Sequence, residues 1–357
     1  MRKVQKLLAL SYLMIIFDLG WIASAEDFTV RIGAGHPKGP APYVTTVSDV
    51  FVKSVEERVL AETDHTVHFI EAYGGSLAGV SETLEAVQYG ILDFGAYCVC
   101  FEPSKLFLHN FPYYEPFGPE SSVDAIAAAR IVYDENPWLT DMLSQRFKQK
   151  LLGLGAWDNY HLGTKTEWKD ISDLAGVKLG GAGPNLPWLK YVGVVPVQSS
   201  LPEGYLAMKT GVYDGWLAPP AAYNGFKYYE PSPNYTLIGF GAMPVNILTV
   251  NEKRFAALPA EIQRIIIEEA KAWEEGNGTA MDASQANGLR MLRENGANIV
   301  ELPAGVRREW AESLSEFPRE KMLEAERRGE PAFAVMQSYI RAAETVGHVW
   351  PVHYKLD

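Results

Sequence analysis

Residues 82–95, ETLEAVQYGILDFG, decide the fold, because their pattern returns in residues 203–216, EGYLAMKTGVYDGW. Both copies have the pattern of a helix closed by a glycine, followed by a short strand that begins near an aspartate. We interpret them as one helix-strand unit used once in each of two similar lobes. Four positions are identical and displaced by the same interval: Glu82 and Glu203, Ala86 and Ala207, Gly90 and Gly211, and Asp93 and Asp214.

Strands alternate with helices on both sides of this unit. Strand patterns occupy residues 28–32, 66–70, 92–97 and 151–156, with helical spacing of apolar residues between several of them. Such alternation predicts mixed sheets covered by helices. The predicted fold class is therefore α/β, with two lobes that are each a mixed sheet flanked by helices, and with a ligand-binding cleft between the lobes.

Local signals extend this prediction along the chain. We expect Ser81 and Asn185 to cap the helices that follow them, and residues 237–240 and 247–250 to be strands that return to the first lobe. A long helix should begin at Pro259. Lobe I is then predicted to comprise residues 26–152 with about 238–285, and lobe II residues 153–237 with about 286–357, including the C-terminal helices.

The first 25 residues have the pattern of an export signal. Arg2, Lys3 and Lys6 precede an apolar run over residues 7–17, and small residues at 23–25 suit a signal peptidase. We expect cleavage after about Ala25 and a periplasmic location. Without these residues the formal charge changes from −12 to about −14. An acidic chain of this kind does not favour nucleic acid as a partner.

The sequence predicts neither a metal nor a cofactor nor an enzyme. Cys98 and Cys100 are interpreted as two small buried thiols, with a labile disulfide as the alternative. His65 and His68 do not share a face of the strand predicted around them. No phosphate-binding loop, zinc-protease motif or nucleophile-elbow motif is present, and nothing pairs a nucleophile with a base.

Several short segments together resemble the DctP-type solute-binding proteins of TRAP transporters. The resemblance implies a two-lobed, type II-like periplasmic binding protein that captures a small organic solute. It also implies delivery of that solute to a membrane permease made of a small and a large subunit. The segments that carry the resemblance are GSLAG at 75–79, GILD at 90–93, WDN at 157–159, DLAGVKL at 173–179, GVYDG at 211–215, NEK at 251–253 and LP at 258–259.

Three departures from the family pattern bear on the solute. The family has an arginine that clamps a carboxylate where this chain has Gly180, and glycine cannot replace a guanidinium. A second family arginine is missing near residues 160–162, and Trp216 to Pro219 stand where the family has an asparagine. We therefore expect an organic, acidic solute that is larger, flatter or less charged than a simple C4-dicarboxylate.

Ten residues are candidates for contact with this solute. Two tryptophans match cleft-facing positions of the family, and two consecutive glycines would present backbone N–H groups unless they form only a tight turn. His36 or Lys38, in the first strand-to-helix loop, could supply a replacement cation. The candidates are His36, Tyr73, Trp157, Asn159, Tyr160, Gly180, Gly181, Trp216, Pro219 and Asn246.

Two other functions fit the same scaffold. A fold does not fix a function, so the chain could be an exported enzyme built on two lobes. It could also be a binding protein that reports to a sensor receptor rather than to a permease. The absence of a recognisable acid-base pair or activated nucleophile favours the solute-binding interpretation over the enzyme.

Overall fold

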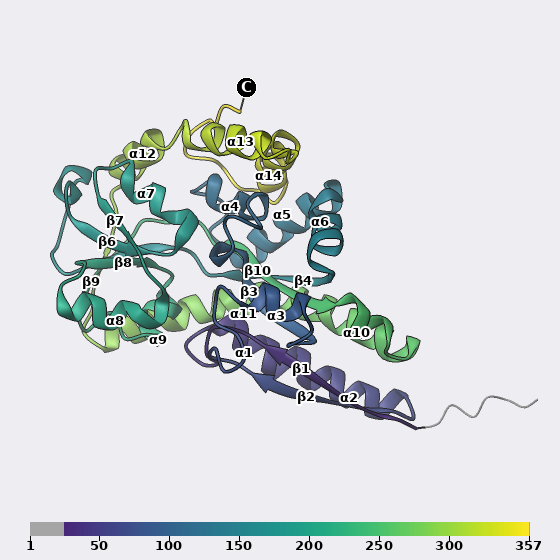
Figure 1. The fold of residues 1–357 in the computed structure, drawn as a ribbon. Helices are drawn as coiled ribbons and strands as arrows, with labels where there is room; N and C mark the ends of the chain where they lie inside the picture. The colour runs from purple at the N-terminus through teal and green to yellow at the C-terminus, as the bar shows by residue number, and fades with distance from the viewer. Residues whose placement is uncertain (1–24, 357) are drawn as a thin grey trace, which may run out of the picture.

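A computed structural model describes residues 25–356 of the chain, so the predicted export signal lies outside the described residues except for Ala25. The described chain forms two mixed β-sheets flanked by helices, and the sheets lie in separate lobes (Figure 1). This arrangement confirms the α/β fold class and the two lobes that the repeated helix-strand unit predicted.

The first sheet has the order β2-β1-β3-β10-β4. Its first three strands are parallel, whereas β10 runs antiparallel to both β3 and β4. Burial of almost every residue of β3 and β10 explains why these strands have apolar runs rather than alternating patterns. The strands are β1 (Asp27–Gly33), β2 (Thr66–Ala72), β3 (Phe94–Cys98), β4 (Gln149–Trp157) and β10 (Met243–Asn251).

The second sheet has the order β11-β9-β5-β8-β6-β7. In this sheet β5 is antiparallel to β8 and β9, while β6 is parallel to β7 and β8. The strands are β5 (His161–Thr164), β6 (Lys178–Gly181), β7 (Val195–Gln198), β8 (Gly215–Ala218), β9 (Asn234–Leu237) and β11 (Asn298–Glu301).

Helices cover both sheets. In the first lobe they are α1 (Pro42–Thr46), α2 (Lys53–Glu62), α3 (Thr83–Gln88), α4 (Phe111–Tyr114), α5 (Ser122–Glu135), α6 (Trp138–Phe147) and α10 (Glu252–Ala256). A π-helical turn, Val47–Val52, joins α1 to α2. In the second lobe they are α7 (Leu186–Lys190), α8 (Leu201–Thr210) and α9 (Pro220–Gly225).

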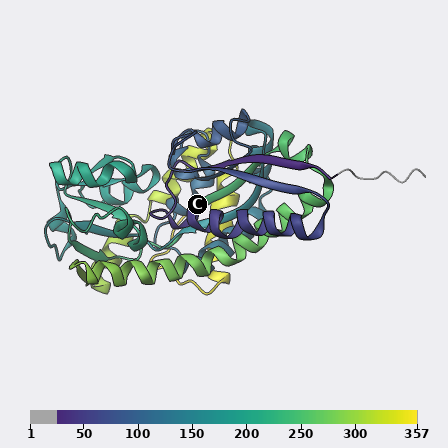
Figure 2. The same cartoon turned by 90° about the horizontal axis from the view of Figure 1, so that it is seen from below.

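The long helix α11 (Ala260–Glu294) packs against both lobes. It packs on β4, α5 and α2 of the first lobe and on α9 of the second. Figure 2 shows it running beneath both lobes. The helix begins directly after Pro259, as the sequence predicted, and a buried stripe that includes Ile262, Ile266 and Trp273 holds it against the protein.

The predicted lobe boundaries stay a prediction, but two packing arrangements bear on them. The expected break after residue 152 falls inside β4, which pairs with β10 as far as Trp157. Of the C-terminal helices, α13 (Phe317–Arg327) and α14 (Ala332–Thr345) pack on α4, and α14 also packs on α5. By contrast, α12 (Ala304–Ser313) places Trp310 against Trp168.

Three local predictions were wrong. Helix α3 begins after Glu82 rather than after Ser81, and the Glu82 carboxylate accepts a hydrogen bond from the Gly79 N–H instead. Asn185 has helical backbone angles and makes no side-chain cap, because the preceding turn already starts the helix. The strand expected at residues 237–240 ends at Leu237 as β9, and it belongs to the second sheet.

Candidate functional site

A pocket lies between the lobes at the ends of strands from both sheets. The first lobe contributes the loop after β1, the turn after β3 and the end of β4, and the second contributes segments that follow β6 and form β8. Strand ends that meet across two α/β lobes are the expected place for a small ligand. The lining residues are His36, Cys100, Phe101, Trp157, Tyr160, Ala182, Asn185, Leu201, Trp216, Leu217, Ala218 and Pro219.

Five of the ten sequence-predicted residues meet in this pocket: His36, Trp157, Tyr160, Trp216 and Pro219. The two tryptophans come from opposite lobes and are both almost completely buried. The cavity that remains has a volume of only about 10 Å³, which is about the room that one water molecule needs. The lobes are therefore closed on one another, and a solute would require them to open.

Aromatic rings form the wall contributed by the first lobe. The ring of His36 packs edge-on against Trp157 and Phe101, with centroid separations of 5.7 and 5.3 Å. Tyr43 packs on Trp157 at 5.2 Å. Contacts of this kind hold a flat surface in place, which suits the stacking of a planar ligand.

The His36 ring is uncharged at neutral pH. Its Nδ1 atom is hydrogen-bonded to the Tyr43 hydroxyl at 2.9 Å, and burial lowers the pKa of His36 to about 4. Its Nε2 atom is buried and has no hydrogen-bond partner among the described residues. His36 therefore does not supply the replacement cation that its loop position suggested.

Lys38 does not supply that cation either. Its ammonium group lies 2.8 Å from both the Ser48 hydroxyl and the Asp49 carboxylate, and the pair is exposed. Lys38 is also not among the residues that line the pocket. The lining side chains include no lysine, arginine, aspartate or glutamate.

Gly180 supports the wall contributed by the second lobe rather than presenting a bare backbone. A Cβ atom at this position would lie 2.7 Å from Trp216 Cζ3 and 2.8 Å from Tyr213 Cε2. The indole of Trp216 occupies the space that a side chain at position 180 would need. The glycine and the tryptophan are thus one packing unit, and there is no room for the family's arginine while Trp216 is present.

The other four predicted residues lie outside the lining of the pocket. Asn159 braces the backbone, because its Oδ1 atom accepts a hydrogen bond from the Gly241 N–H at 2.9 Å. Gly181 pairs with β7 at the end of β6, and Tyr73 follows β2. Asn246 is buried on β10, and neither of its side-chain amide atoms has a partner among the described residues.

The prediction of two free thiols was wrong, because Cys98 and Cys100 form a disulfide. Strand β3 ends at Cys98, and a 3-10 turn over Val99–Phe101 follows. That turn brings the two side chains together. Cys100 lies in the pocket wall, so the disulfide fixes part of the site.

Asn185 is a pocket residue that the sequence argument assigned only to a helix cap. Its Oδ1 atom is buried without a partner among the described residues. The tight turn before it depends on Gly183, which has a φ of +54°, and a Cβ there would lie 2.7 Å from the Cys100 carbonyl oxygen. Glycine therefore permits the second lobe to approach the first at this point.

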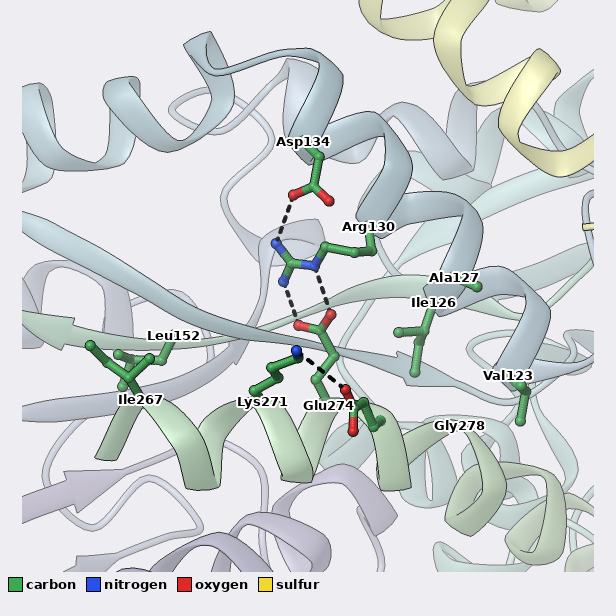
Figure 3. A pocket seen from close by; sticks show the side chains of 11 residues that line it. Val123, Ile126, Ala127, Arg130, Asp134, Leu152, Ile267, Lys271, Glu274 and Gly278 are labelled. Atoms are coloured by element: carbon green, nitrogen blue, oxygen red, sulfur yellow. Dashed lines mark hydrogen bonds and ion pairs between the residues drawn. The ribbon is translucent and has the colours of Figure 1, made fainter. Parts of the chain in front are cut away.

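A larger hollow of about 630 Å³ lies elsewhere, between α5, β4 and α11 (Figure 3). At its centre the Arg130 guanidinium makes two hydrogen bonds to the Glu274 carboxylate. That carboxylate also accepts a hydrogen bond from the Leu154 N–H at 2.6 Å. These charges serve the packing of α5 on α11, and the hollow is far from the strand ends that form the interlobe pocket.

Two features of residues 25–356 bear on other functions. No group of three or more histidine, cysteine, aspartate or glutamate side chains in this range is placed to hold a metal ion. No helix within the same range is both long enough and apolar enough to cross a membrane.

Two lobes that enclose a pocket at their facing strand ends are the architecture of two-lobed solute-binding proteins. The chain belongs to the bacterial extracellular solute-binding protein family 7, DctP, whose family model matches residues 41–324. This finding confirms the resemblance that the short sequence segments indicated.

Known proteins similar to this chain agree with that membership. A solute-binding protein of a Sulfitobacter species is 28% identical over 200 residues, which cover 55% of this chain and 56% of that relative. A marine metagenome TRAP solute-binding protein in complex with 3-hydroxybenzoate has a TM-score of 0.80 at 21% identity, covering 91% of this chain and all of the other. A Rhodoferax ferrireducens TRAP solute-binding protein in complex with copurified benzoate has a TM-score of 0.79 at 17% identity, covering 89% and 98%.

Proposed function

We propose that this chain is the periplasmic solute-binding subunit of a TRAP-type secondary transporter and that it captures a small, flat organic acid for uptake. The solute binds in the interlobe pocket, between Trp157 and Trp216. The lobes close around it and deliver it to a membrane permease made of a small and a large subunit. No chemical conversion of the solute takes part in this function.

The observation that carries the proposal is the pairing of aromatic walls from two lobes around one pocket. Trp157 comes from the first sheet and Trp216 from the second, so a ring held between them links the lobes. A ligand that contacts both lobes favours the closed arrangement over the open one by its differential affinity.

The relatives support the flat, acidic class of solute. Two structurally similar TRAP solute-binding proteins hold 3-hydroxybenzoate and benzoate, both planar aromatic acids. Trp216 packs over Gly180, the position at which the sequence resemblance implies the family's arginine. Ring surface at this position favours a planar solute over a small aliphatic diacid.

The periplasmic location rests on the export pattern of residues 1–25. Expression of the full chain in a Gram-negative host should give a protein that is released with the periplasmic fraction and begins near Glu26. Retention of the first 25 residues, measured by N-terminal sequencing or intact mass, would contradict the export step.

Titration calorimetry on mature protein, residues 26–357, tests the binding function. The panel contains planar aromatic acids, uronates, pyroglutamate, succinate and malate. We expect one-to-one binding of at least one planar aromatic acid and weak binding of the two aliphatic diacids. Tight succinate or malate binding would refute the proposed solute class, and no binding by any member of the panel would count against the function.

A further inference from the structure

Two polar atoms in the pocket wall, one from each lobe, have no partner. They are His36 Nε2 and Asn185 Oδ1, and both are buried without a hydrogen bond to any described residue. Both side chains are about 1% exposed. A buried polar group without a partner is destabilising, so native proteins keep few of them unless a ligand or water completes the hydrogen bonds.

The chemistry of Asn185 restricts the ligand group that can complete the pair. Its carbonyl oxygen is a hydrogen-bond acceptor and needs a donor. An ionised carboxylate offers only acceptors, so it would leave the Asn185 oxygen unsatisfied. A hydroxyl or a ring N–H provides the required donor.

The chemistry of His36 is compatible with the same group. When the Tyr43 hydroxyl donates to Nδ1, the neutral ring carries its proton on Nε2 and can donate it. A hydroxyl oxygen can accept that hydrogen bond while its own proton is donated elsewhere. A hydroxyl therefore has the hydrogen-bonding chemistry that each of the two unpaired atoms requires.

The charge of the pocket leads to the same conclusion. No lysine or arginine lines it, and Lys38 is paired with Asp49 outside it. Burial of an ionised group without an opposite charge is unfavourable. The group that meets His36 and Asn185 is therefore expected to be uncharged.

We propose that His36 and Asn185 are specificity-determining residues that together recognise an uncharged hydroxyl or N–H group on a flat solute. This inference rests on the proposed function and deepens it. Recognition of the solute depends on the ring substituent at this pair, and a carboxylate elsewhere on the ring contributes less to affinity.

Four planar probes separate the two contributions: 3-hydroxybenzoate, benzoate, 3-hydroxyacetophenone and acetophenone. The acetyl group has nearly the shape of the carboxylate but no charge. In titrations of mature protein we expect loss of the hydroxyl to weaken binding by about tenfold or more in both pairs, since a buried group is left unpaired. Exchange of carboxylate for acetyl should change affinity by less than about threefold, because no cation faces it.

Variants test the residues themselves. Asn185→Leu and His36→Phe should each remove the preference for hydroxylated probes. The unliganded melting temperature of Asn185→Leu should equal or exceed that of the wild type, because this substitution removes a buried unpaired atom. His36→Phe should melt lower than Asn185→Leu, because it also leaves the buried Tyr43 hydroxyl without its partner. His68→Phe is the matched control, since His68 is exposed on β2 and should leave affinity unchanged.

The results distinguish this inference from the proposed function. Binding that follows the carboxylate and ignores the hydroxyl overturns the inference and leaves the solute-binding function intact. Failure of all four probes would count against both the inference and the proposed planar class of solute. A fall of several degrees in the melting temperature of unliganded Asn185→Leu would show a structural role and would also overturn the inference.

Discussion

Substitution of Gly180 by alanine tests the claim that Trp216 packs directly on Gly180 and leaves no room for a side chain there. The new methyl group would lie 2.7 Å from Trp216 Cζ3 and 2.8 Å from Tyr213 Cε2. Real Cβ atoms essentially never come this close to another heavy atom. Because both rings are almost completely buried, neither can turn into solvent to relieve the overlap.

Overpacking of a buried site by one methyl group costs about 1–3 kcal/mol of unfolding free energy. For a protein of this size we expect a fall of about 1.5–4 °C in melting temperature. The displaced indole moves toward the interlobe pocket, so solute affinity should fall as well. Gly180→Ala combined with Trp216→Phe should be destabilised by less than the sum of the single changes, because the smaller ring makes room.

Thermal unfolding measured by circular dichroism supplies the test. Gly276→Ala is the matched control, because Gly276 lies inside α11 and a Cβ added there would meet no atom within 4 Å, so the change should be neutral or slightly stabilising. A melting temperature for Gly180→Ala equal to that of the wild type would refute the packing argument. So would full additivity in the double variant.

Three further predictions concern stability. Reduction of the Cys98–Cys100 disulfide should lower the unfolding free energy by no more than about 1.5 kcal/mol, since the disulfide closes a very short loop. Urea titrations with and without dithiothreitol measure this difference. A loss above about 4 kcal/mol would be inconsistent with the short loop. Burial raises the pKa of Asp158 to about 7, so the folded state binds a proton that the unfolded state releases, and stability is lost as the pH rises toward 7. Asp158→Asn should therefore gain about 2 kcal/mol relative to wild type between about pH 5 and pH 8, and an equal pH dependence of the two melting curves would contradict this. Glu274→Ala leaves the Arg130 charge without its partner and should lower the unfolding free energy by about 2 kcal/mol. This loss is smaller than for a fully buried pair, because Arg130 is 34% exposed. An unchanged urea midpoint would show that the pair contributes little.

The sequence was sufficient to predict the architecture because the determining signals are local. Gly90 and Gly211 close helices in corresponding units, and the buried stripe of α11 follows directly from Pro259. These patterns depend only on residues that are close together in sequence, so they can be recognised from the sequence itself. The two lobes and the long helix could therefore be predicted without any structure.

The site could be predicted only in part, because its decisive contacts cross between lobes. The structure places Trp157 and Trp216 in one pocket, although their role in binding stays a prediction. Asn185 was assigned to a helix cap because its neighbours in sequence gave no sign of what faces it. Gly180 was interpreted as presenting a bare backbone N–H group or as part of a tight turn, because nothing in the local pattern shows that the Trp216 ring lies over it.

The most direct test is a titration of one planar hydroxylated acid, 3-hydroxybenzoate, into wild-type protein and into Trp216→Ala. The melting temperature is measured at each concentration of the acid. Above the dissociation constant, the unfolding free energy of the wild type should rise with the logarithm of the ligand concentration. At a ligand concentration one hundred times the dissociation constant, the rise should be about 2.7 kcal/mol. Trp216→Ala should show no such rise, because the second lobe has lost its wall. An equal rise in both proteins would contradict binding between the lobes, and no rise in the wild type would contradict the proposed solute class.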